Sequence, residues 1–369
     1  AQRLLLTVAV GVAVGLAGMA PVLADMDGSS DAEREASTGF KRSSPDNDEQ
    51  PVEIISLDPT VRVVGLFKDA HGAVARISSR NADSFARVTL KNGRLGLRPL
   101  PGYRKNLMPR RPEMLSDGIV TQGTKDIAPA WLAVPTRRYG HGVLGDGIEA
   151  SGLRARHRDG RHLSYSLSNA SVFEDRSVRL ADLNGDGRDE LVVVRSYLDA
   201  GAALAVFGVG VDAGELTLIA ETDAIGLPYR WLNPAGIADF DGDGRLEVAV
   251  VVTPHIGGIL KIYELRGRRL VEEWSGKGFS NHAMGSRIQD MAAVVDWGKG
   301  PILLLPDAQR GAIREVYFDV SGYHMRALSG HDHPVVTAVV AADLDGDGFE
   351  EVLYGLGNGE LHTIYWKRR

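Results

Sequence analysis

The fold is decided by an acidic, glycine-rich segment at residues 238–247, which reads ADFDGDGRLE. Aspartate occupies alternate positions of this segment, at Asp239, Asp241 and Asp243, and Glu247 follows four residues later. Gly244, at the sixth position counted from Asp239, permits a sharp bend that a bulkier residue would resist. The segment therefore predicts a tight turn lined by carboxylate oxygens.

Two further segments repeat this pattern. They read ADLNGDGRDE at residues 181–190 and ADLDGDGFEE at residues 342–351. The first aspartates of the three copies lie 57 and 104 residues apart, and the longer interval is close to two steps. A fourth copy is therefore expected near residues 291–296. There, residues 292–300 read AAVVDWGKG, which keeps the frame but retains only one acidic residue, Asp296.

Hairpin-type turns recur with the same period. Each contains glycine between short, alternating apolar runs, and after the first interval the steps are about 54 residues. These turns are Asn92-Gly93, Asp159-Gly160, Asp212-Ala213-Gly214, Arg266-Gly267 and Ser321-Gly322. Two independent features with one period indicate a structural repeat.

Each repeat contains up to four short strands and no stretch of helical period. Four antiparallel strands in a unit of this length are typical of a β-propeller blade, so the expected fold class is all-β. Units that begin near residues 60, 118, 176, 233, 290 and 336 predict six blades, with five or seven left open. The last unit is one strand short. We expect an N-terminal strand, at residues 52–55 or 61–64, to cover that edge.

The composition is that of a folded soluble protein. Of 369 residues, 44% are hydrophobic and 24% are charged, which excludes a largely disordered or polytopic membrane chain. The net charge of −6 argues against nucleic-acid binding over the whole surface. The sequence has no cysteine, which excludes disulfides, thiolate metal sites and cysteine nucleophiles.

The N-terminal region predicts export. An apolar run at residues 4–17 precedes a small-residue cleavage pattern at Val22-Leu23-Ala24, so residues 1–24 are interpreted as a signal peptide, with an uncleaved anchor as the alternative. Residues 25–50 are expected to be a disordered acidic linker, followed by the propeller domain at residues 51–369. Export without cysteine indicates a bacterial periplasmic or secreted protein. We expect a monomer with no stable membrane insertion after cleavage.

The acidic segments suit calcium. Alternating carboxylates on a tight turn supply the hard oxygen ligands that Ca²⁺ prefers. An EF-hand would carry Glu at the twelfth position, but here that position holds Val193, Val250 and Tyr354, and strand-like sequence follows. An Asp/Gly-rich turn without metal is the alternative.

The three segments resemble the FG-GAP or VCBS repeats of bacterial secreted proteins, and are similar to the calcium-binding blades of the integrin α-subunit propeller. The resemblance covers residues 170–369 by motif and residues 60–170 by spacing alone. It implies about three Ca²⁺ ions and no ion at Asp296. The implied ligands are Asp182, Asn184, Asp186, the Arg188 carbonyl and Glu190; Asp239, Asp241, Asp243, the Arg245 carbonyl and Glu247; and Asp343, Asp345, Asp347, the Phe349 carbonyl and Glu351.

Polar and aromatic residues occupy the other connections. If the acidic turns join the first two strands of each blade, the remaining long connections lie on the opposite face. We expect their side chains to converge around a central pore and contact a glycan or another anionic or hydroxylated ligand. Unrelated surface loops are the alternative. The candidates are Arg138, Tyr139, His141, Tyr197, Trp231, Asn233, His255, Asn281, His282, His331 and His333.

The favoured function is a non-enzymatic binding scaffold for a glycan or protein. The sequence contains no Gly-x-Ser-x-Gly, phosphate-loop or dinucleotide-binding motif, and no catalytic residue is assigned. A polysaccharide lyase or glycosidase remains an alternative, with Arg138, Tyr139, His141 and Asp307 as the available residues. The integrin resemblance also implies a cell-adhesion protein.

Overall fold

All regular structure in the described residues is β-strand. The computed structural model describes residues 61–78, 83–105, 107–210 and 214–365, and the backbone of residues 52–56 and 366. These residues belong to one compact unit, residues 50–369. The predicted signal peptide (1–24) and nearly all of the predicted linker lie outside the described residues. No helix long and apolar enough to span a membrane occurs in the described part of the chain.

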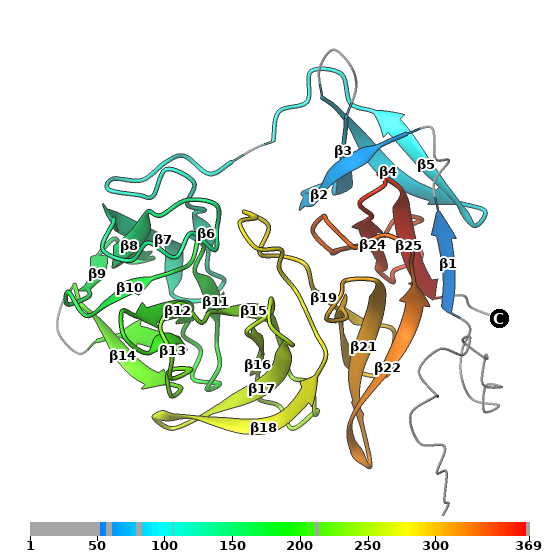
Figure 1. The fold of residues 1–369 in the computed structure, drawn as a ribbon. Coiled ribbons are helices and arrows are strands. Elements are labelled where there is room, and N and C mark those ends of the chain that lie inside the picture. Colours follow the sequence, from blue (N-terminus) through cyan, green and yellow to red (C-terminus); the bar gives the residue numbers. More distant parts are fainter. Residues whose placement is uncertain (1–51, 57–60, 79–82, 106, 211–213, 367–369) are drawn as a thin grey trace, which may run out of the picture. The chain divides into compact units, whose positions relative to one another are not determined.

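Three sheets are four-stranded antiparallel meanders in chain order (Figure 1). The first contains β2 (Val63–Asp69), β3 (Gly72–Ile77), β4 (Ser84–Lys91) and β5 (Arg94–Pro99). The second contains β15 (Leu232–Ala238), β16 (Glu247–Val252), β17 (Ile259–Arg266) and β18 (Arg269–Lys277). The third contains β19 (Ala293–Asp296), β20 (Pro301–Pro306), β21 (Ala312–Asp319) and β22 (Gly322–Gly330).

A nine-stranded sheet contains two more such sets. One is β6 (Thr121–Gln122), β7 (Ile127–Thr136), β8 (Glu149–His157) and β9 (His162–Ser166). The other is β11 (Arg179–Ala181), β12 (Glu190–Tyr197), β13 (Gly201–Val209) and β14 (Leu216–Glu221). The short β10 (Ser171–Phe173) pairs with β12 and, through Phe173 and Ala150, with β8. β10 and β11 pair with opposite ends of β12, as two pieces of one interrupted strand.

The last sheet joins the two ends of the repeat region. It contains β23 (Val340–Ala342), β24 (Glu351–Gly355) and β25 (Leu361–Trp366), and β1 (Val52–Ser56) pairs antiparallel with β25. This pairing confirms that an N-terminal strand completes the last unit, and it selects residues 52–55 of the two candidates. Residues 63–64 instead begin β2, the first strand of the next set.

The predicted hairpin turns join the third and fourth strands of each set. Asn92-Gly93 lies between β4 and β5, Asp159-Gly160 between β8 and β9, and Arg266-Gly267 between β17 and β18. Ser321-Gly322 lies at the turn between β21 and β22. The turn at residues 212–214 lies largely outside the described residues.

The core explains why central strands are almost continuously apolar. Alternate side chains of a strand point to opposite faces of its sheet, and here both faces are covered. In β12, Leu191 and Val193 pack with strands β7 and β8, whereas Val192 and Val194 pack with β16. The same alternation in β16, β20 and β24 links successive sheets through separate core clusters. Among the described residues, no such cluster joins the β2–β5 set to the β6–β9 set.

Candidate functional site

Each acidic loop connects the first two strands of its set, which is the condition under which the other long connections are expected on the opposite face. The loops run from β11 to β12, from β15 to β16 and from β23 to β24. In all three, the ninth-position glutamate closes the loop by accepting a backbone amide hydrogen bond. The pairs are Leu183 to Glu190 at 2.8 Å, Phe240 to Glu247 at 2.6 Å, and Leu344 to Glu351 at 2.6 Å.

The first aspartate of each loop is held in the same way. Its Oδ2 atom accepts the amide of the sixth-position glycine, at 3.0, 3.0 and 3.1 Å in the three loops. These glycines, Gly187, Gly244 and Gly348, have φ angles of 84°, 91° and 92°, which other residues adopt only with strain. Hydrogen bonds from backbone amides therefore hold these carboxylates in place by themselves.

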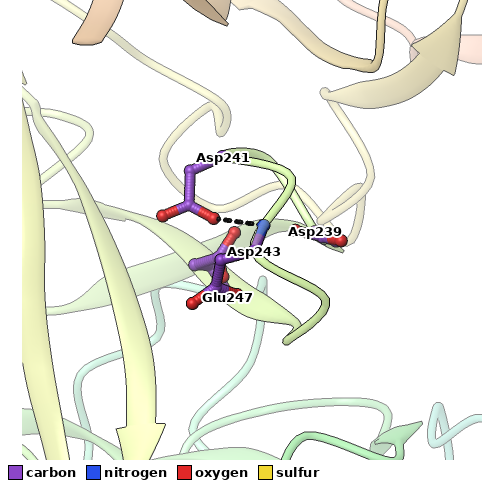
Figure 2. Close-up of side chains that lie close together, drawn as sticks. All are labelled: Asp239, Asp241, Asp243 and Glu247. Atoms are coloured by element: carbon purple, nitrogen blue, oxygen red, sulfur yellow. Dashed lines mark hydrogen bonds between the residues drawn. The ribbon is translucent and has the colours of Figure 1, made fainter. Parts of the chain in front are cut away.

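The second loop gathers four carboxylates on one turn (Figure 2). One ligand atom from each of Asp239, Asp241, Asp243 and Glu247 lies within 4.8 Å of the others. Oδ1 of Asp239 is buried and has no hydrogen-bond partner. An unpartnered buried carboxylate oxygen is costly, and a cation with oxygen ligands would satisfy it.

The third loop brings together oxygens of Asp343, Asp345 and Glu351 within the same 4.8 Å. The side chain of Asp347 is not in this group; it accepts the amide of Phe349 at 2.8 Å, as Asp243 accepts that of Arg245 at 2.9 Å in the second loop. Of the predicted acidic ligands in this loop, three therefore already form one group in the described structure, and Asp347 lies on the same turn.

The first loop differs in two contacts. Its Asp182 Oδ1 is also buried without a hydrogen-bond partner, as in the second loop. However, Nδ2 of Asn184 donates to Glu190 at 3.1 Å, and Nζ of Lys125 lies 3.7 Å from Oδ2 of Asp182. Lys125 thus supplies part of the positive charge that an ion would bring.

The electrostatics of the three loops favour a bound cation. Burial, together with the charges of nearby aspartates, raises the pKa of Glu190, Glu247 and Glu351 to about 7. A positive ion would reverse that shift, because it stabilises the ionised form. The eroded turn lacks this arrangement: Oδ1 of Asp296 accepts the amides of Gly298 and Gly300, at 2.7 and 3.1 Å.

Several predicted ligand-binding residues are buried in the structure. Tyr139, Trp231, Asn233, Asn281 and His282 are all at most 2% exposed. The amides of Asn233 and Asn281 donate to each other's backbone carbonyl, at 3.1 Å in both directions. These side chains hold neighbouring sheets together and are not exposed to a ligand here.

Five of the predicted residues do meet in one cluster, which Tyr139 joins through an edge-on contact with the His141 ring. Trp231 packs against the rings of His255 and His282, and Nε2 of His255 lies 2.9 Å from Nδ1 of His282. The Trp231 indole donates to the Glu174 carbonyl at 3.0 Å, and Nδ1 of His141 lies 2.7 Å from Oε1 of Glu174. Glu174 is fully buried and was not predicted, because nothing in its local sequence marks it.

The other predicted residues lie in separate environments. Arg138 donates to the Ser171 carbonyl at 2.6 Å, and the Tyr197 hydroxyl donates to Glu221 at 2.7 Å. His331 packs against His362, and His333 is exposed. The predicted convergence therefore applies to the group around Trp231 and to the buried pair Asn233 and Asn281.

A cavity of about 820 Å³ has a different lining. None of the predicted ligand residues lines it. Its charged residues are Arg76, Lys105, Arg176, Arg179, Arg287 and Asp290. Three of these residues lie within or just before the first strand of a set: Arg176, Arg179 and Asp290. Their equivalent positions in the repeat are the sequence feature that could have identified them.

Comparison with known proteins supports the repeat assignment. Residues 182–250 match the family model described as an FG-GAP-like repeat, which spans the first two acidic loops. There is no significant match among curated proteins.

Solved structures show only a distant likeness. The crystal structure of BBS1N in complex with ARL6DN, soaked with mercury, has a TM-score of 0.34 at 13% identity, over 83% of this chain and 78% of that chain. The crystal structure of exotype rhamnogalacturonan lyase YesX has a TM-score of 0.34 at 13% identity, over 80% of this chain and 70% of that chain. Likeness at this level assigns no function.

Proposed function

We propose that this FG-GAP repeat protein is a calcium-stabilised, six-bladed β-propeller that acts as an exported, non-enzymatic binding scaffold. The observation that carries the proposal is the pair of buried, unpartnered carboxylate oxygens in matching loops, on Asp182 and Asp239. Each lies in a turn whose other carboxylate oxygens accept backbone amides at matching positions.

Calcium would act as a structural ion. In the second loop, Asp239, Asp241, Asp243 and Glu247 supply carboxylate oxygens, and the Arg245 carbonyl supplies a fifth ligand. The first and third loops supply the equivalent set. Because the glutamate begins the second strand of each set, an ion held there would fix the turn relative to its sheet. Binding to the folded state alone stabilises it, by about 2.7 kcal/mol at a calcium concentration one hundred times Kd.

The scaffold role is supported by the repeat family and by the site chemistry. The three loops use their acidic side chains for backbone and ion contacts, which leaves no free carboxylate pair for catalysis there. The signal peptide predicted at residues 1–24 supports a periplasmic or secreted location. The ligand is proposed to be a glycan or a protein.

A polysaccharide-acting enzyme is the second candidate, supported by one contact. A buried glutamate that holds one ring nitrogen of a histidine leaves the other nitrogen available for proton transfer. Glu174 and His141 have this arrangement, and the half-exposed Tyr229 ring lies 5.5 Å from the His141 ring. Loss of activity on polysaccharide in a His141→Gln variant would establish this candidate over the scaffold.

Isothermal titration of the purified protein with calcium tests the scaffold proposal. We expect about three ions per chain, and one fewer in each of the variants Asp239→Asn and Asp343→Asn. Asp296→Asn is the matched control, because it changes the eroded turn, and it should bind as many ions as the parent. Absence of calcium binding by a folded parent protein would refute the proposal.

A further inference from the structure

The 820 Å³ cavity has a predominantly apolar wall. Its volume falls within the range of about 300–1,000 Å³ that is typical of small-molecule sites. Leu66, Phe67 and Phe85 line one part of it, and Ile237 and Ile288 line another. Such a wall can bury an apolar ligand, but by itself it does not favour a charged ligand over a neutral one.

One arginine is fixed at the cavity by a buried carboxylate. Asp175 is fully buried, and its Oδ2 accepts a hydrogen bond from Nη1 of Arg179. Oδ1 of Asp175 accepts the Gln289 amide at 3.0 Å and the Arg176 backbone amide at 2.9 Å. The Val194 amide also donates to Oδ2 of Asp175, at 3.1 Å, so bonds from two other segments and from its own stretch fix Asp175, which holds the guanidinium of Arg179 in a defined position beside the cavity.

Two further charges in the lining have no ion-pair partner among the described residues. The ammonium group of Lys105 lies 4.5 Å from the centre of the Phe67 ring. The residue Asp290 is exposed to the cavity, although the surrounding protein raises the pKa of its carboxyl by burial. Lys105, Arg176 and Arg179 are all close enough to Asp290 to oppose that shift. Asp290 thus adds negative charge near Lys105, whereas Arg176 and Arg179 form direct ion pairs with Asp117 and Asp175.

We propose that this cavity binds an amphipathic organic anion, whose acidic group meets Lys105 and Arg179 and whose apolar body packs against Phe67, Ile237 and Ile288. The inference rests on the proposed function, since it gives the scaffold a ligand class. An anion bound there lies near Asp290 and is repelled by it. Asp290 therefore limits affinity for anions and has little effect on a neutral ligand of the same shape.

Two fluorescent probes separate charge recognition from apolar burial. 1-Anilinonaphthalene-8-sulfonate carries a sulfonate, and N-phenyl-1-naphthylamine is the corresponding neutral compound. Both are titrated into the calcium-loaded protein, with the variants Lys105→Met, Arg179→Met and Asp290→Asn. The control is Lys299→Met, which removes an exposed lysine outside the cavity.

The expected results differ between the probes. Lys105→Met and Arg179→Met weaken sulfonate binding about tenfold, and Asp290→Asn strengthens it several-fold. Each variant leaves the neutral probe within about twofold of the parent. Arg179→Met disturbs the contact with buried Asp175, so Lys105→Met, at an exposed position, keeps the test independent of folding.

Two results would overturn the inference: parallel changes in both probes, or no binding of the sulfonate by a folded parent. The calcium titration decides the proposed function separately. Calcium binding without charge-selective probe binding refutes only the ligand class, whereas charge-selective probe binding without calcium binding refutes the proposed function and leaves the anion site.

Discussion

The backbone amide of Asp189 donates a 2.8 Å hydrogen bond to the Asp126 side chain. In return, the buried Asp189 carboxylate accepts the amides of Lys125 and Ile127, at 2.9 and 3.1 Å. Asp189 lies in the first acidic loop, and Asp126 lies in the turn before β7. The loop and the neighbouring set of strands therefore hold each other in place.

Replacing Asp189 with alanine should destabilise the protein. The change leaves the buried Ile127 amide and the part-buried Lys125 amide without an acceptor, which costs about 1–3 kcal/mol of unfolding free energy. Urea denaturation measures the loss, and Asp199→Ala, at an exposed turn, is the control. An unchanged unfolding free energy in Asp189→Ala would show that the two amides find other partners.

Lys125→Met should strengthen calcium binding at the first loop. It removes a cation 3.7 Å from Asp182 that competes with the ion. A partly exposed ion pair is worth about 0.2–1 kcal/mol, so a change of about 1.4- to fivefold in Kd is expected. Titration in an Asp239→Asn, Asp343→Asn background isolates this loop, with Lys299→Met as control. Weaker calcium binding in Lys125→Met would show that Lys125 does not compete with the ion for Asp182.

Gly244→Ala should reduce both stability and calcium affinity. Gly244 has φ 91° and Gly298, in the eroded turn, has φ 89°, and an added Cβ meets no atom within 4 Å at either position. Backbone strain alone should then cost each alanine variant about 1–2 kcal/mol. Calorimetric titration should show weaker calcium binding only in Gly244→Ala. Equal calcium affinities in the two variants would show that the turn conformation at Gly244 does not contribute to calcium binding.

Calcium should stabilise the protein more at high pH than at low pH. Burial raises the pKa of Glu190, Glu247 and Glu351 to about 7, above the ordinary value of 4.5. In calcium-free protein, their contribution to stability is lost as the pH rises from about 4.5 to about 7, because the folded state holds the extra protons. Calcium displaces these protons. Because one glutamate proton competes with the ion at each loop, calcium affinity at that loop falls up to about tenfold for each pH unit below about 7.

The calcium-induced rise in Tm, measured at about pH 5.5 and about pH 8, checks this prediction. Glu247→Gln should bind calcium more weakly at the second loop and flatten the pH dependence. An equal calcium-induced shift at both pH values would exclude proton competition at these glutamates.

The histidine pair should make the fold sensitive to acid. Burial, followed by nearby positive charge, lowers the pKa of His255 and His282 from 6.5 to about 4. Between these values the unfolded chain binds protons that the folded chain does not, so unfolding free energy falls as the pH falls. Urea denaturation of His282→Gln should show a smaller loss between about pH 7.5 and about pH 5 than the parent. His71→Gln, at an exposed position, should behave as the parent does.

The chain sequence was sufficient where the determining interactions are local. Each acidic loop closes through bonds between residues at most seven positions apart, such as Phe240 to Glu247, so its pattern can be read in one short segment. The hairpin turns are local in the same sense. The strands of each set could be predicted from short apolar runs separated by turn residues. The central strands are almost continuously apolar because both of their faces are covered.

Which charges meet depends on how the strands pack in three dimensions. Lys125 lies beside Asp182, and His141 beside Glu174, across separate strands of the fold. Lys105 and Asp290 share one cavity although 185 positions separate them. The sequence also predicted an exposed role for Asn233 and Asn281, which are buried. Exposure and pairing depend on how sheets pack, and packing joins residues with no fixed spacing along the chain.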